Sequence, residues 1–386
     1  QTHDQAGWLR LSGDVSTGTK QITGMSLKPV KIGLCGLGTV GGGTFNALRE
    51  NAALVNARAQ AGLQVVHVGA RRDNPDCPLG DTRVSRDVFA VARDPEVDIL
   101  VELIGGTTVA RELVVTAIEA GKHVVTANKA LIAEFGNEIF ALADRHGVEV
   151  RFEAAVAGGI PIIKALREGL AGNRIEWLAG IINGTGNYIL TEMRDKGRDF
   201  NDVLAEAQAL GYAEADPSFD VDGTDAAHKL VILAAIAFGM PLQFESVYTE
   251  GITCLTPQDV DYAEELGYRI KHLGVAKQNG EGVELRVHPT LIPEKRLLAN
   301  VNGVKNAVLV EGDAVGPTLY YGAGAGSLPT ASAVVADVVD LTRVLTTDPN
   351  NRVPHLAFHA DELSDIPVLP MDQVETAYYL RVSALD

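Results

Sequence analysis

Apolar residues in the first half of the chain form short runs that alternate with helical patterns. The runs "PVKIGL", "LQVVHVGA", "VDILVELIGG" and "KHVVTANK" are continuous, and "ARELVVTAIEAG" between the last two has helical spacing. Buried strands alternating with helices are typical of a parallel sheet that is covered on both faces. The pattern therefore predicts a doubly wound α/β domain over residues 25–153, whose border is marked by a further strand from about residue 148.

The pattern of apolar and polar residues is different in the second half of the chain. We expect strands in "RIEWLAGIINGTGNYIL", "YTEGITCLT", "RIKHLGVAKQ", "GVELRVHPTLI" and "NAVLVEGDAV", with helices between some of them. This pattern predicts an α+β domain over residues 154–316, with a mixed sheet and helices on one face. Residues 317–345, which include the helical "TASAVVADVVDLTRVL", are assigned back to the first domain, and residues 346–370 are predicted to be a linker. Residues 1–24 lack periodicity and are predicted to be a poorly ordered leader or tag.

Composition excludes several classes of protein. The 386 residues carry a net charge of −17, which argues against a nucleic-acid surface. No apolar run approaches the ~20 residues of a membrane span. Three scattered cysteines form neither a disulfide framework nor a zinc spacing, which favours a reducing cytoplasm. Neither they nor the nine histidines predict a transition-metal site.

The turn "GLGTVG" follows the first predicted strand and opens a helix, which is the context that the G-x-G-x-x-G pattern requires. Gly36 permits a tight turn, Gly38 lets the backbone approach a pyrophosphate, and Gly41 allows close packing of helix on strand. The motif thus predicts a Rossmann-type dinucleotide site, and the alternative is a glycine-rich turn without a ligand.

The second strand ends in "VGARRD". Arg71 and Arg72 stand where an acidic residue would bind a ribose hydroxyl, and Asp73 follows them. Two arginines favour a 2′-phosphate, hence NADP, without excluding NAD; a solvated loop is the alternative. Lys129 in "TANKA" is predicted at the carboxyl end of a strand, where it could serve the nicotinamide or an anionic substrate group, or be an ordinary surface lysine.

The stretch "GYAEADPSFDVDGTDAAHKL" sets five carboxylates beside one lysine, at the start of an apolar helix. Asp225 and Lys229 share a helix face, and the apolar "LVILAAIAFG" indicates that this helix is buried. A buried lysine tuned by carboxylates can transfer a proton to and from a substrate oxygen, and Glu214 or an aspartate could bind an ammonium group. Together with a hydride acceptor, these groups suggest oxidation of an amino-acid alcohol. The alternatives are a surface ion pair and an acidic loop without a catalytic role.

The motifs "GLGTVG", "ELIGG", "TANKALIA", "EAAVAGGIPII", "INGTGNYIL", "GYAEADPSFDVDGTDAAHKL" and "YYGAGAGSLPTASAV" run in one order from about residue 29 to 343. In this set and order the chain closely resembles the homoserine dehydrogenases, which interconvert L-homoserine and L-aspartate 4-semialdehyde with NAD(P) for threonine, methionine and isoleucine biosynthesis.

The resemblance implies a role for each matching position. Lys229 matches the proton donor and acceptor, and Lys129 matches a lysine that contacts both cofactor and substrate. The implied substrate-binding residues are Glu214, Asp220, Asp225 and Thr185. The implied cofactor-binding residues are Gly36, Gly38, Thr39, Val40, Gly41, Arg71, Arg72, Gly106, Lys129, Gly211 and Gly326.

Three further expectations come from the resemblance alone. The segment from Glu153 to Ile160 resembles a loop for sodium or potassium, to which Glu153, Val156, Gly158 and Ile160 contribute largely through carbonyl groups. The substrate domain is expected to form a homodimer or homotetramer. The end "ETAYYLRVSALD", within residues 371–386, resembles the first strand of an ACT regulatory domain, through which threonine could act in a longer protein. Gly186 departs from the family, which usually has threonine in this position.

Two other functions are weighed against this one. A phosphorylating aspartate-semialdehyde dehydrogenase needs an acylating cysteine beside a histidine, and none of Cys35, Cys77 and Cys254 has such a setting. A non-catalytic NADP-sensing protein would keep the glycine turn but would have no reason to retain Lys229 with its carboxylates.

Overall fold

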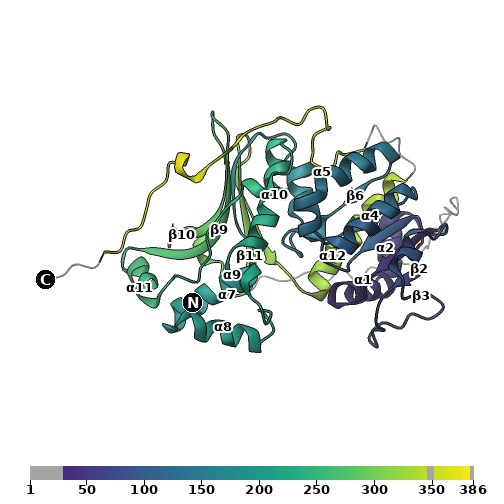
Figure 1. Cartoon of the computed structure of the whole chain (residues 1–386), viewed down its shortest axis with the longest axis horizontal. Coiled ribbons are helices and arrows are strands. Elements are labelled where there is room, and N and C mark those ends of the chain that lie inside the picture. The colour runs from purple at the N-terminus through teal and green to yellow at the C-terminus, as the bar shows by residue number, and fades with distance from the viewer. Residues whose placement is uncertain (1–28, 346–351, 383–386) are drawn as a thin grey trace, which may run out of the picture.

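The computed structural model describes residues 29–345 and 352–382, which form two sheets side by side, with helices around and between them (Figure 1). The expected leader at 1–24 and the first part of the expected linker lie outside the described residues.

The first sheet has six parallel strands in the order β3-β2-β1-β4-β5-β6. The residues of β1, β4, β5 and β6 are almost wholly buried, as continuous apolar strands predict, whereas β3 lies at the edge of the sheet and is largely exposed. This sheet confirms the expected doubly wound α/β fold. The strands are β1 Val30–Cys35, β2 Leu63–Gly69, β3 Arg83–Ser85, β4 Ile99–Glu102, β5 His123–Thr126 and β6 Val150–Arg151.

Helices cover both faces of this sheet. One apolar cluster joins the strands to α1, α2 and α12, and another joins them to α3, α4 and α5. The helix α12 comes from the far end of the sequence and packs on α1 (Figure 1). The bounds are α1 Thr39–Glu50, α2 Ala52–Ala59, α3 Val88–Ala92, α4 Thr108–Glu119, α5 Lys129–His146 and α12 Ser327–Val344.

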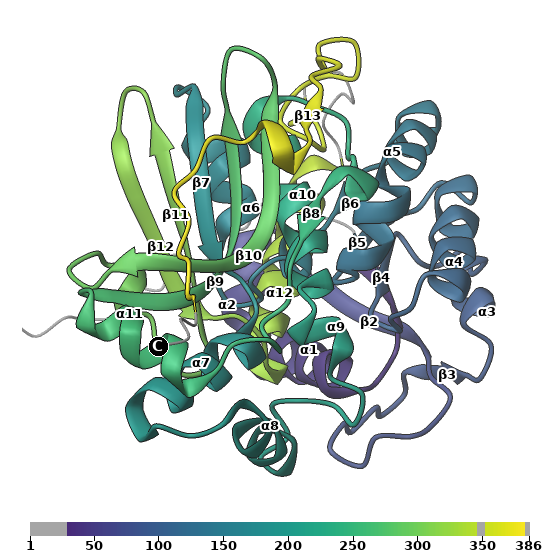
Figure 2. The same ribbon diagram turned by 60° about the vertical axis from the view of Figure 1, so that its left-hand side comes forward.

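The second sheet is mixed, with the order β12-β11-β7-β9-β10-β13 and with β8 also paired to β10 (Figure 2). The pairs that β10 makes with β8 and β13 are parallel and the others are antiparallel. The mixed sheet confirms the expected second fold element. The strands are β7 Ile175–Ile181, β8 Tyr248–Thr249, β9 Tyr268–Gln278, β10 Val283–Pro293, β11 Lys305–Gly312, β12 Gly316–Ala323 and β13 Val368–Leu369.

The apolar helix α10 packs on strands β7, β9 and β10, and a separate apolar cluster joins α7, α8 and α11. The α-helices of this half are α6 Ile162–Lys164, α7 Gly184–Lys196, α8 Phe200–Ala209, α9 Ser218–Val221, α10 Thr224–Phe238 and α11 Pro257–Glu265. The 3₁₀-helices are η1 Glu153–Ala155, η3 Phe244–Ser246, η4 Leu298–Asn300 and η6 Met371–Gln373, and η2 Ala165–Gly169 is a turn of π-helix.

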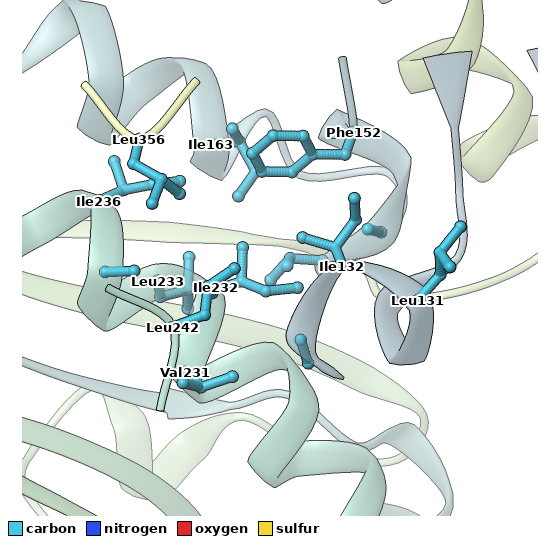
Figure 3. Packing of buried hydrophobic residues seen from close by; sticks show 14 of the residues in the cluster. Leu131, Ile132, Phe152, Ile163, Val231, Ile232, Leu233, Ile236, Leu242 and Leu356 are labelled. Carbon is cyan, nitrogen blue, oxygen red and sulfur yellow. The ribbon is translucent and has the colours of Figure 1, made fainter. Parts of the chain in front are cut away.

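The two halves share one core. Residues of α5 from the first half and of α10 from the second lie in the same apolar cluster, to which Leu356 of the C-terminal segment contributes (Figure 3). Because this packing is continuous, the helix that carries Lys129 and the helix that carries Lys229 are held against each other.

Several expected elements differ from the structure. The segment "NGTGNYIL" is not a strand but the start of α7, because the Asn183 side chain accepts a hydrogen bond from Gly186 N and begins a helix. Lys129 does not end a strand but is the first residue of α5, whose N-cap is Asn128. Only Tyr248–Thr249 of "YTEGITCLT" is a strand.

The C-terminal part also needs correction. Residues 317–323 do not belong with the first domain, because they form most of β12 and pair with β11 at the edge of the second sheet. The expected linker is not free of structure, since Val368–Leu369 pairs with β10. No strand is described in residues 371–382, where an ACT strand was expected. None of the helices among the described residues has the length and apolarity to span a membrane.

Candidate active site

The glycine turn after β1 needs glycine at two positions for steric reasons. Gly36 has a φ of 101°, and a Cβ there would lie 2.5 Å from Leu103 O. A Cβ on Gly41 would lie 1.9 Å from Gly36 O, so helix α1 could not approach the strand. A Cβ on Gly38 would meet nothing within 4 Å. Gly38 is therefore not required by packing within the chain, and its open side is where a pyrophosphate would approach.

Two helices begin beside this turn. Thr39 and Val40 open α1, and Gly326 precedes the first residue of α12. The Ser327 hydroxyl donates to Thr39 O at 2.8 Å, which ties the two helix starts together. Helix N-termini present unpaired N–H groups that suit phosphate oxygens, so the turn fits a dinucleotide.

Arg71 and Arg72 follow β2 and are exposed. The nearby Asp73 is held by Arg86, whose Nη2 lies 2.8 Å from Asp73 Oδ1. Arg86 also donates to Ala70 O at 3.0 Å. The acid near the end of β2 is thus paired with a neighbouring arginine, while Arg71 and Arg72 remain at the surface.

A buried carboxylate organises the loop after β4. Glu102 Oε1 accepts from Ile104 N and Gly105 N at 2.8 and 3.2 Å, and Oε2 accepts from the Thr126 hydroxyl at 2.6 Å. Asn128 Nδ2 donates to Gly106 O at 2.6 Å. Gly106, expected at the cofactor, is thereby fixed next to the start of α5.

Lys129, Asp225 and Lys229 form a chain of charges between α5 and α10. The Lys229 ammonium lies 2.6 Å from Asp225 Oδ2 and donates to Ile182 O at 2.7 Å. Lys129 Nζ lies 3.1 Å from Asp225 Oδ1. The side chains of Asp225 and Lys229 are 6% and 11% exposed, whereas that of Lys129 is 31% exposed. Both lysines thus share one buried carboxylate.

Burial and charge act in opposite directions on this group. Burial raises the pKa of Asp225, but the ammonium groups of Lys229 and Lys129 outweigh it and lower the pKa to about 2. Burial lowers the pKa of Lys229, although the Asp225 carboxylate works against that change. A lysine in this setting loses its proton more readily than one in water, which suits a group that accepts and returns a proton.

Asn183 is a site residue that sequence reasoning missed. Its Nδ2 donates to Asp220 Oδ1 at 2.7 Å and to Asp225 Oδ2 at 2.8 Å, while its Oδ1 caps α7. Thr185 donates to Tyr212 O at 2.7 Å. Burial raises the pKa of Asp220, and hydrogen bonds from Asn183 and Thr185 work against this shift. In the sequence, the only signal for Asn183 was its place between a strand and a helix, which is typical of an N-cap. Only the fold shows that the carboxylates of Asp220 and Asp225 lie beside it.

Glu214 is not brought into this cluster. It lies in the exposed connection between α8 and α9, near Gly211, which has a φ of 74°. Its backbone carbonyl accepts from Gln208 Nε2 at 3.0 Å. Within the described chain its carboxylate has no hydrogen-bond partner, so it is available to a ligand.

Comparison with known proteins bears on the whole chain. The family model for homoserine dehydrogenase matches residues 161–339, and the model for the NAD binding domain of homoserine dehydrogenase matches residues 36–153. The homoserine dehydrogenase of Pseudomonas aeruginosa is 69% identical over 360 residues, which are 93% of this chain and 83% of that protein. The chain belongs to the homoserine dehydrogenase family.

Solved structures agree with this membership. The homoserine dehydrogenase of Thiobacillus denitrificans is 67% identical, with a TM-score of 0.86 over 90% of this chain and 81% of that one. A hyperthermophilic archaeal homoserine dehydrogenase in complex with NADPH is 27% identical, with a TM-score of 0.69 over 82% of this chain and 98% of that one. The chain is thus an NAD(P)-dependent oxidoreductase that interconverts L-homoserine and L-aspartate 4-semialdehyde, as its motifs predict, and it acts on a small molecule.

The alternative functions are not favoured. Cys35 and Cys77 are buried and donate weakly to Val88 O and Gly42 O, and burial raises the pKa of both thiols. Cys254 is exposed, and none of the three contributes to the charged cluster. A purely NADP-sensing protein would not need the buried charged residues between α5 and α10.

The expected cation loop follows β6 in this member of the homoserine dehydrogenase family. Its backbone is unusual: Ala157 and Gly158 have φ values of 53° and 31°. The Glu153 carboxylate accepts from Ile163 N and Lys164 N at 2.9 and 2.8 Å, so it is already committed to the protein backbone. The described residues contain no cluster of three or more His, Cys, Asp or Glu side chains suited to a metal. Any contribution of this loop to a cation would therefore come from carbonyl groups.

Proposed function

We propose that Lys229 transfers the proton at the homoserine hydroxyl, with Asp225 as its buried counter-charge. The observation that supports this role is the pair itself: a nearly buried ammonium group lies 2.6 Å from a carboxylate at the junction of the two halves. A surface ion pair would be solvated on both sides and would need no such burial.

Lys229 and the nicotinamide together account for the proton and the hydride that homoserine loses. In the oxidation, neutral Lys229 takes the hydroxyl proton while the carbon that bears the hydroxyl loses a hydride, and the C–O bond becomes a carbonyl. The oxidised nicotinamide supplies the acceptor for that hydride when it is bound. In the reverse direction, the Lys229 ammonium returns the proton to the aldehyde oxygen. Burial lowers the pKa of Lys229, which favours the neutral form that accepts the hydroxyl proton.

The other charged residues bind the amino-acid part of the substrate. The exposed Glu214 carboxylate would bind the ammonium group, and Asp220 and Thr185 would make further contacts to the substrate. Lys129 binds the substrate carboxylate with the part of its ammonium that Asp225 leaves exposed. Each of these contacts is a charge-assisted hydrogen bond, which makes recognition specific to a zwitterion.

Steady-state kinetics test the role of Lys229. Lys229→Ala should lower kcat by about 10²–10⁴-fold, as expected for the loss of a general acid–base group, with nearly unchanged cofactor binding. Glu214→Ala should instead raise mainly the KM for homoserine. Near-normal turnover in folded Lys229→Ala would overturn the assignment.

For the cofactor, we propose a preference for NADP. Gly36, Gly38, Thr39, Val40, Gly41, Gly106, Gly211 and Gly326 would surround the dinucleotide. Arg71 and Arg72 would bind the 2′-phosphate, and the pairing of Asp73 with Arg86 supports this because it neutralises the acid that could otherwise repel a phosphate.

We also propose that a sodium or potassium ion binds through carbonyl groups of Glu153, Val156, Gly158 and Ile160. The two residues with positive φ in this loop support the proposal, because such a backbone can turn successive carbonyl groups toward one point. Activity should fall in a buffer that contains only a bulky organic cation and recover when sodium or potassium is added. Unchanged activity would remove the cation from the proposal.

A homodimer or homotetramer formed through the second sheet is the expected assembly. The sheet face opposite α10 carries a small cluster of its own, against which Trp177, Val275, Leu309 and Leu319 are only partly buried, and this supports an interface there. The domain boundaries, apart from the correction at 317–323, and a cytoplasmic location stay predictions. Size measurement in solution tests the assembly.

A further inference from the structure

An aromatic side chain stands at the active site without a role in the reaction as described. Phe219 lies in α9, within the acidic stretch and next to Asp220, yet it is 42% exposed. An exposed phenylalanine alone needs no explanation, but this one faces a charge. Lys129 Nζ lies 5.4 Å from the centroid of its ring.

The ring of Phe219 is supported from behind. Its centroid lies 5.4 Å from that of His228, and the His228 ring stacks on Phe244 at 4.2 Å with an interplanar angle of 16°. His228 Nε2 is 3.1 Å from Glu134 Oε1 on α5. His228 is therefore fixed by a ring on one side and by a hydrogen bond across the two halves on the other.

These contacts give α5 and α10 two polar connections. Lys129 and Glu134 of α5 meet Asp225 and His228 of α10. The first connection holds the exposed lysine, and the second holds the histidine that supports Phe219. The rings of Phe244, His228 and Phe219 thus form a series that begins with a partly buried ring at the edge of the core and ends beneath the Lys129 ammonium.

We propose that Phe219, supported by His228 and Phe244, is a positioning residue that holds the Lys129 ammonium where it binds the substrate. A lysine side chain has four rotatable bonds and carries a large rotamer entropy. Asp225 restrains Lys129 by charge from one side, and the face of the Phe219 ring attracts the same ammonium from another. The inference rests on the proposed binding of the substrate carboxylate by Lys129.

The first experiment compares kinetic constants of Phe219 variants. Phe219→Leu keeps an apolar side chain but removes the ring face, and it should raise the KM for homoserine about two- to five-fold, the strength of a partly exposed cation–ring contact. The kcat and the KM for the cofactor should stay close to those of the unchanged enzyme. Phe219→Tyr keeps the ring and should restore the KM.

The chain offers a matched control on the same helix as Lys129. Arg111 lies over the ring of Phe135 at 4.6 Å, which is the same type of contact but involves neither Lys129 nor Phe219. Phe135→Leu should leave the KM for homoserine unchanged. A similar rise in that variant would show a general effect of losing a ring and would overturn the proposal.

A double-mutant cycle shows whether Phe219 acts through Lys129. In a Lys129→Met background, Phe219→Leu should produce no additional rise in KM, because the group that it positions is gone. Independent, multiplying effects would mean that Phe219 touches the substrate by itself, and they would overturn the positioning role.

The same measurements separate this inference from the proposed function. An unchanged KM for homoserine in Lys129→Met would overturn the substrate role of Lys129. A raised KM in Lys129→Met with an unchanged KM in Phe219→Leu would overturn only the role of Phe219. Because Phe219 is exposed, its variants should fold, and equal unfolding temperatures would verify this.

Discussion

The side-chain amide of Asn183 makes hydrogen bonds both to the N-terminus of a helix and to two acidic residues. Its oxygen accepts from Gly186 N, and its nitrogen donates to Asp220 and to Asp225. The same residue therefore links the start of α7 to the charges at the reacting centre, and the two tasks can be separated by substitution.

Asn183→Ala should lose both tasks. Losing the cap costs about 1 kcal/mol of stability. Losing hydrogen bonds to charged carboxylates should lower kcat/KM roughly ten- to a hundredfold. Asn183→Ser retains a cap but cannot donate as far, so it should regain stability without regaining activity. Thermal unfolding and steady-state kinetics on both variants check this, and full activity in Asn183→Ser would contradict it.

Replacement of Arg71 and Arg72 by alanine should raise the KM for NADP more than the KM for NAD. Only NADP carries the 2′-phosphate that these guanidinium groups would bind. Arg93→Ala is a suitable control, since Arg93 is exposed in the same half but follows α3 and lies over the ring of Phe89. Equal changes for the two cofactors would count against the assignment.

At the scale of the element, two glycines in the turn from β1 into α1 have different roles, one in folding and the other in binding the dinucleotide. A side chain at position 41 would clash with the backbone of Gly36, whereas Gly38 faces open space. Gly41→Ala should therefore lower the unfolding temperature. Gly38→Ala should fold normally and bind the dinucleotide weakly, because the added methyl group stands where a phosphate approaches. Calorimetry and a titration with NADPH measure the two effects, and equal outcomes for the two variants would refute this division.

Periodicity predicted five of the six parallel strands and the glycine turn, because buried strands and βα turns leave local signals. It did not predict β3 Arg83–Ser85, which is three residues long and largely exposed. It failed at "NGTGNYIL", where an apolar run with β-branched residues was a helix, since the cap at Asn183 and packing on α8 and α11 outweighed local preference. The grouping of Lys129 with Asp225, almost a hundred positions away, depends on how α5 packs on α10. The family resemblance identified Lys129 and Asp225 as site residues. The sequence could not show that Asn183, Phe219 and His228 lie around them.

At the scale of the molecule, residues 352–369 connect the two halves a second time. This segment follows α12, contributes Leu356 to the shared core and ends in β13 at the edge of the second sheet (Figures 1 and 3). Val150 N of β6 donates to His355 Nε2 at 3.1 Å, across more than 200 positions. His355 therefore accepts with one nitrogen and must be neutral.

This contact predicts a dependence of stability on pH. Burial lowers the pKa of His355 to about 3, with help from Arg151 and Arg167, whereas an unfolded histidine titrates near 6.5. Stability from this group is full above pH ~6.5 and is lost as pH falls towards 3, because only the unfolded chain gains the proton. The slope has an upper limit of ~1.4 kcal/mol per pH unit.

The measurement is the free energy of unfolding between pH 7 and 5. His355→Gln should show a smaller decline than the unchanged chain, because glutamine does not titrate. His359→Gln is the control, since His359 belongs to the same segment but is exposed. Identical declines for the unchanged chain and both variants would show that His355 does not contribute.

The position of α12 has a consequence for synthesis of the protein. All six strands of the parallel sheet are complete by Arg151, yet one of their faces needs Val334, Val338 and Leu341, which come almost two hundred residues later. A ribosome would thus have released the whole first sheet, and most of the second, before this face could be covered. The nascent chain would have to keep that apolar surface from aggregating until α12 emerged, and the ability to hold a dinucleotide would arise only after α12 had been translated.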